Sequence, residues 1–130
     1  MSKEFQNEQV QTILKNRVTD DDGIRKLCRQ AILRILVGIR KIEGRKLEEV
    51  KERSGLSLST LMKLEANSVL VTSSALERYS RGVDVPYSIV VRFLEKLERD
   101  YRKTGIEPID TINRDKLLGF LKLMSESEIE

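Results

Sequence analysis

The residue types that support catalysis are scarce in this sequence of 130 residues. It has no histidine and a single cysteine, Cys28, so the usual zinc-site spacings and histidine-activated nucleophiles are unavailable. No glycine-rich loop is arranged to hold phosphates. The acids Asp20, Asp21 and Asp22 lack the remaining ligands of a calcium loop and suit the first turn of a helix better. We therefore expect neither an enzyme, nor a metal site, nor a bound cofactor.

The chemistry that remains is recognition of a polyanion by clustered cations. Between residues 24 and 46, Glu43 is the only acid. The bases there are Arg25, Lys26, Arg29, Arg34, Arg40, Lys41, Arg45 and Lys46. Among the charged residues of the stretch 104–130, acids instead outnumber bases by six to three. The formal net charge of +3 permits nucleic-acid binding without requiring it.

The expected compartment is the cytoplasm, with no membrane partner. Cys28 stands alone on a helical pattern, which excludes a disulfide framework and favours a small buried side chain. The N-terminal residues lack the apolar core of a signal peptide. The most apolar window, residues 31–39, is interrupted by Arg34 and is too short to span a bilayer.

The elements that must position the cations are predicted to be helices throughout. The sequence has few aromatic residues, prolines and glycines, and its apolar residues recur with a period near 3.6 residues. Both features indicate an all-α protein. The predicted helices outside the central pair cover residues 4–18, 24–42, 72–83, 87–103 and 113–124, followed by a frayed polar tail at 125–130. The helix at 24–42 is apolar almost all round, so a second partner must cover it. That partner is the N-terminal helix or a twin subunit, and a fully intramolecular core is the alternative.

The centre of the chain is residues 46–66, predicted to form two short helices joined by a tight turn. Gly55 lies where the chain reverses, since glycine takes a positive φ without steric cost. Ser57 is expected to cap the second helix, whose residues Leu61 and Leu64 face the core. The outward face then carries Leu58, Ser59, Met62 and Lys63.

This pattern resembles the Cro/C1-type (xenobiotic-response-element) family of helix-turn-helix transcriptional regulators. The resemblance spans residues 36–97 and includes Arg40, Gly44, Glu65 and the spacing of residues 72–86. It implies an all-α, five-helix, lambda-repressor-like core with additional N- and C-terminal helices. The implied divisions are 1–23 (N-terminal helix and acidic turn), 24–103 (DNA-binding domain with an extended first helix) and 104–130 (C-terminal helix and acidic tail).

The resemblance also implies a set of residues that contact double-stranded DNA. They are Arg40, Arg45, Lys46, Leu47, Ser57, Leu58, Ser59, Met62, Lys63 and Asn67. Arg40 is expected to pair with Glu65 and to offer its remaining donors to a phosphate. Asn67 stands where relatives often have glycine at a left-handed helix end.

Several positions depart from the family pattern. Leu47 stands where many relatives have a phosphate-contacting glutamine, and Lys46 replaces a capping serine or threonine. Lys51 replaces a small alanine at a close helix contact, so it must extend outward or the helices must separate. The loop at residues 69–71 is apolar, so it should contribute little to phosphate binding.

Two functions follow as expectations. The first is a repressor-like, sequence-specific transcriptional regulator, acting as a homodimer with recognition helix 57–66 in the major groove. The alternative is a protein-interaction module, such as an antitoxin-like partner binder. It would use Leu58, Met62 and the loop Val69–Val71 as its contact surface.

Overall fold

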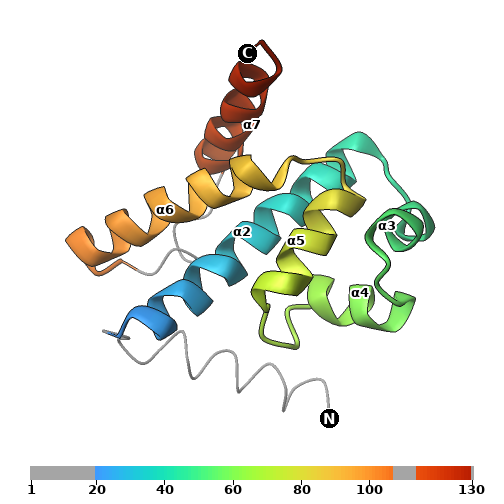
Figure 1. Cartoon of the computed structure of the whole chain (residues 1–130), viewed down its shortest axis with the longest axis horizontal. Coiled ribbons are helices and arrows are strands. Elements are labelled where there is room, and N and C mark those ends of the chain that lie inside the picture. Colours follow the sequence, from blue (N-terminus) through green and yellow to red (C-terminus); the bar gives the residue numbers. More distant parts are fainter. Residues whose placement is uncertain (1–19, 107–113, 130) are drawn as a thin grey trace.

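The structure, a computed structural model, describes residues 20–106 and 114–129, and all regular elements within these ranges are helices (Figure 1). The predicted all-α class is therefore confirmed for the described part of the chain. The helix predicted at residues 4–18 lies outside the described residues. None of the described helices combines the length and the apolar composition that crossing a bilayer requires.

The predicted elements are present with small differences at their ends. In chain order they are α2 (Asp21–Glu43), α3 (Leu47–Ser54), α4 (Leu58–Glu65), α5 (Ser73–Gly82), α6 (Tyr87–Thr104) and α7 (Arg114–Ile129). α2 begins before its apolar stripe because Asp21 and Asp22 provide an acidic first turn, which the helix dipole favours. The predicted end of the last helix at residue 124 is wrong, since α7 continues to Ile129. Residues 125–128 are polar, but the stretch 125–129 contains neither glycine nor proline to end a helix.

α2 is the central helix and contacts α4, α5, α6 and α7 (Figure 1). Its buried residues are Ile24, Leu27, Cys28, Gln30, Ala31, Ile32, Leu33, Ile35, Leu36 and Ile39. The prediction that this helix is buried on more than one side is confirmed. Part of the second side is covered by α7, where Phe120 is fully buried and packs edge-on against Phe93 of α6 with ring centroids 5.0 Å apart. Sequence reasoning had not considered α7 as that partner.

The short helices α3 and α4 lie at one end of the molecule, where α5 separates α3 from α2 while α4 contacts α2 directly (Figure 1). α3 packs chiefly against α5. Of the two expectations for Lys51, the outward extension is the one found, since its side chain is 48% exposed and its Nζ lies 3.9 Å from Glu48 Oε2. The close approach between α3 and α5 occurs at Gly82 instead. The close spacing of α3 and α5 thus depends on a glycine of α5.

Candidate nucleic-acid interface

The turn between α3 and α4 has the predicted construction. Gly55 has a φ of 75°, in the left-handed region, and ends α3. The Ser57 side chain then accepts a hydrogen bond from the Thr60 backbone N–H and caps α4. Glycine and serine together therefore fix the angle at which α4 begins.

α4 presents one side to the core and the other to solvent. Leu61 and Leu64 are buried, as predicted. Ser59, Met62 and Lys63 are exposed, with 57% of Met62 accessible. Leu58 is only half-buried and stands at the edge of this face. We call the exposed surface of Ser59, Met62 and Lys63 the outer face of α4.

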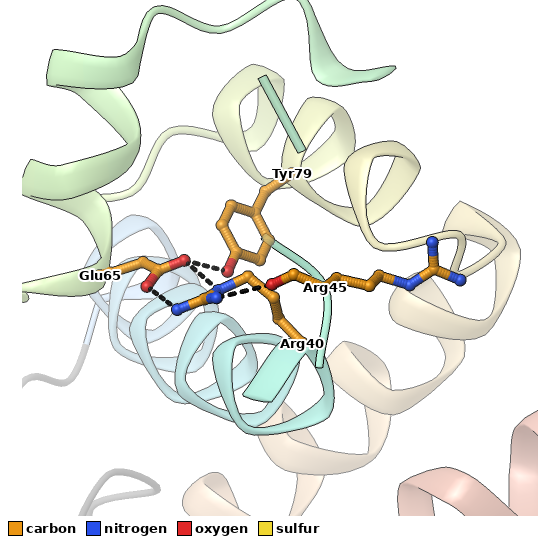
Figure 2. A network of polar contacts seen from close by, with 4 residues as sticks. All are labelled: Arg40, Arg45, Glu65 and Tyr79. Atoms are coloured by element: carbon orange, nitrogen blue, oxygen red, sulfur yellow. Dashed lines mark hydrogen bonds and ion pairs between the residues drawn. The ribbon is translucent and has the colours of Figure 1, made fainter. Parts of the chain in front are cut away.

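The inner side of α4 is anchored to α2 by the predicted pair of Arg40 and Glu65 (Figure 2). Arg40 donates from Nε to Glu65 Oε2 and from Nη2 to Oε1, both at 2.7 Å, which is a bidentate fork. The third nitrogen, Nη1, donates to the backbone oxygen of Arg45 at 2.8 Å. The two side chains are only 14% and 12% exposed, so solvent screens this pair weakly.

Tyr79 of α5 completes the anchor, a contact that sequence reasoning missed. Its hydroxyl donates to Glu65 Oε2 at 2.7 Å, so one carboxylate joins α2, α4 and α5 (Figure 2). Burial and the neighbouring Glu65 raise the pKa of the Tyr79 hydroxyl, and the hydrogen bonds to Glu65 raise the pKa of Arg40. A buried tyrosine hydroxyl needs a hydrogen-bond partner, and this need is the one signal in the sequence that could have indicated the contact.

Arg45 is less available than expected for a contact with a phosphate. Its Nε donates to Glu43 at 2.7 Å, and its Nη2 lies 3.9 Å from Asp84. The bond to Glu43 raises the pKa of Arg45, so the charge is retained but partly neutralised locally. In Figure 2 the Arg45 side chain extends away from the Glu65 network.

Lys46 and Lys63 are the more accessible cations of the predicted set. Both are exposed, and neither forms an ion pair with another described residue. Lys46 precedes α3 and, as expected, provides no side-chain cap. Leu47 is half-buried against the core, which limits what it can offer to a ligand.

The loop after α4 is tied down more firmly than the sequence indicated. Asn67 has the predicted left-handed conformation, with a φ of 56°. Its side-chain oxygen accepts a hydrogen bond from Gln30 at 2.7 Å, so this side chain is held toward α2. Val71 is only 2% exposed, and Leu70 is the one large apolar side chain of the loop that is exposed. The expected contact surface Val69–Val71 is therefore wrong for Val71, which belongs to the core.

Comparison with protein-family models, curated proteins and solved structures gives no match for this chain. Among the side chains that the structure describes, no group of three or more histidine, cysteine or acidic residues is placed to hold a metal ion. The residues brought together are thus an exposed helix face, a buried anchor behind it and flanking cations. Such an arrangement can bind a surface.

Proposed function

We propose that this chain is a Cro/C1-type, repressor-like transcriptional regulator that binds double-stranded DNA as a dimer. The observation that carries the proposal is the anchoring of α4 by Arg40, Glu65 and Tyr79. These bonds hold the inner side of a short helix while its outer face remains exposed. A helix that enters the major groove needs this rigidity, because base contacts are directional and short.

The outer face of α4 offers a mixed chemistry to base edges. Lys63 can donate to guanine O6 and N7 or to a phosphate, and Ser59 can bond to a base or to the backbone. Met62 can contact the methyl group of thymine. We therefore propose that α4 recognises its site through one or two polar contacts from Lys63 and Ser59, together with an apolar contact from Met62 that favours thymine.

Phosphate contacts are proposed to come from around this face. Lys46 is exposed beside the start of α3, and Arg40 retains N–H donors beyond those bound to Glu65 and Arg45. The first N–H groups of α5, which follow its cap Thr72, are a further source of donors to phosphate oxygens. These contacts would supply the affinity that does not depend on sequence.

Dimerisation is proposed because operators of this kind are read by two-fold related helices. Exposed apolar side chains support a further protein contact. Ile42 of α2 is 67% exposed and Leu118 of α7 is 50% exposed. Both lie outside the outer face of α4, so a subunit contact through them would leave that face free.

A protein-binding function is the second candidate, and exposed apolar residues beside α4 favour it. Met62 and Leu70 are 57% and 39% exposed, respectively. Because Val71 is buried, the surface available to such a partner is narrower than the sequence indicated. This candidate predicts a contact that is apolar and weakly dependent on salt.

The deciding experiment is a salt series of DNA affinity. A duplex selected from a random pool and a scrambled duplex would be titrated at several salt concentrations, with light scattering to count subunits. We expect the logarithm of the association constant to fall steeply with the logarithm of salt, by about 0.9 per phosphate contact. A flat response with both duplexes would reject DNA binding and favour the protein-binding function.

A further inference from the structure

Gln30 is a buried polar residue that neither the sequence analysis nor the proposed function uses. It lies in the middle of α2 and is 2% exposed. It also precedes residues 36–97, the stretch that carries the family resemblance. Burial of an amide is costly unless both its oxygen and its nitrogen find partners, so the partners of Gln30 show what this side chain does.

Both ends of the Gln30 amide are bonded to the loop between α4 and α5. Nε2 donates to the side-chain oxygen of Asn67 at 2.7 Å and lies 3.5 Å from the backbone oxygen of Val69. Oε1 accepts from the backbone N–H of Val71 at 2.6 Å. The neighbouring Arg29 also donates from Nε to the backbone oxygen of Val71 at 2.9 Å. We call these contacts the Gln30 clamp.

The clamp holds the two sides of the candidate interface at once. Asn67 is the left-handed residue that follows the end of α4. Its backbone N–H donates to the backbone oxygen of Leu64, and the backbone N–H of Ser68 donates to the backbone oxygen of Lys63. Val71 directly precedes Thr72, the cap of α5. One side chain of α2 therefore connects the end of α4 to the start of α5.

We propose that Gln30 is a positioning residue of the DNA interface, acting through the loop that joins α4 to α5. The inference rests on the proposed function and extends it to a residue outside the surface that meets DNA. Burial of Val71 could hold the loop close to α2 without any polar contact. What the amide adds is alignment, because only one placement of the loop satisfies its donor and its acceptor together.

This alignment matters because α4 and the first turn of α5 are proposed to contact the same duplex. Two contacts reinforce each other only when their separation matches that of their targets. The clamp is therefore expected to influence affinity without itself removing or adding a phosphate contact.

The test compares two variants with the unmodified chain. Gln30→Met keeps the length of the side chain and removes its hydrogen bonds to Asn67, Val69 and Val71. Asn67→Gly removes only the bond between the two side chains and retains the left-handed end of α4 at no steric cost. DNA affinity is measured in a salt series, at temperatures where melting curves show each variant fully folded. Hydrogen exchange of the Val71 amide is followed in parallel.

We expect Gln30→Met to weaken binding about tenfold, the factor that corresponds to 1.4 kcal/mol, with the salt slope unchanged. Asn67→Gly should weaken it less, and the double variant should match Gln30→Met because both act on one network. Exchange of the Val71 amide should accelerate in Gln30→Met but not in Asn67→Gly. Wild-type affinity in folded Gln30→Met would overturn the proposal, and if that variant does not fold, wild-type affinity in Asn67→Gly would do so.

These results separate the inference from the proposed function. A chain that shows no salt-dependent binding to any duplex overturns both. If the unmodified chain binds and Gln30→Met binds equally well, the regulator proposal stands and the positioning role fails. A changed salt slope in Gln30→Met would also count against positioning, since it would indicate a lost phosphate contact.

Discussion

Gly82 of α5 lies so close to Val50 of α3 that a β-carbon on the glycine would come within 2.6 Å of Val50 Cγ1. The same atom would lie 3.0 Å from the backbone oxygen of Val50 and 3.2 Å from Cβ of Ser54. A valine side chain can rotate away, but the backbone of a packed helix cannot do so without moving. The spacing of α3 and α5, and with it the position of the turn before α4, depends on the absence of a side chain at residue 82.

The first prediction is that Gly82→Ala destabilises the fold. Alanine normally favours a helix over glycine by about 1 kcal/mol, so the sign of the effect is informative. Here overpacking should prevail and lower the unfolding free energy by about 1–3 kcal/mol. Denaturant titration measures it. The matched control is Gly119→Ala in α7, where the added carbon meets nothing within 4 Å and should be neutral or stabilising. Equal stabilisation of both variants would contradict the close contact.

The second prediction concerns the anchor behind α4. Arg40→Lys keeps the charge but cannot form the fork to Glu65, so the buried network loses at least one charged hydrogen bond even though Tyr79 still donates to Oε2. We expect a loss of about 2–3 kcal/mol in unfolding free energy. The control is Arg81→Lys, whose pair with Glu77 is 3.7 Å long and well exposed, so it should cost less than about 0.5 kcal/mol. Similar melting temperatures for the two variants would show that the fork does not stabilise the fold.

The sequence was sufficient for features that depend on neighbouring residues. Apolar spacing placed the helices, and the chemistry of single positions placed Gly55, Ser57 and Asn67 in their turns and caps. Arg40 and Glu65 were paired only through the family resemblance, since nothing local relates residues so far apart. Local patterns thus predicted the elements, whereas the resemblance supplied a contact between them.

Several of the features that were missed depend on how distant elements meet. Gln30 and Asn67 are 37 positions apart, and a glutamine in a helix gives no sign that it will be buried. The local neutralisation of Arg45 by Asp84 likewise requires the turn after α5 to return beside α3. Polar contacts of this kind follow from the packed arrangement, so periodicity along the chain does not predict them.

The third prediction is that Cys28 is chemically inert in the folded protein. Burial, with a contribution from Glu98, raises the pKa of its thiol from 9.0 to about 12. The thiolate is the reactive form, so its population near neutral pH should fall about a thousandfold. A thiol reagent should therefore label the chain only as fast as it unfolds, and labelling should become rapid in denaturant. Rapid labelling under native conditions would show that this part of α2 opens readily.

The fourth prediction concerns which side chains on and beside α4 bind any duplex and which favour the cognate sequence. Lys63→Ala should weaken binding to cognate and scrambled duplexes alike, because a long cation reaches phosphates and bases. Its salt slope should flatten by about one unit if the contact is to a phosphate. Arg40→Ala should weaken both as well and should also destabilise the fold, since it leaves Glu65 without its partner.

Met62→Ala and Leu58→Ala should instead lower the preference for the cognate site. An apolar side chain gains only from the methyl group of particular thymines, so its loss should cost about 1–3 kcal/mol on the cognate duplex and little on others. Met62 should have the larger effect because it is 57% exposed, whereas Leu58 is half-buried. Titration of each variant with both duplexes at several salt concentrations checks this division. If none of the four substitutions changes either affinity, α4 does not enter the groove, and Met62 should then be tested as part of a protein contact.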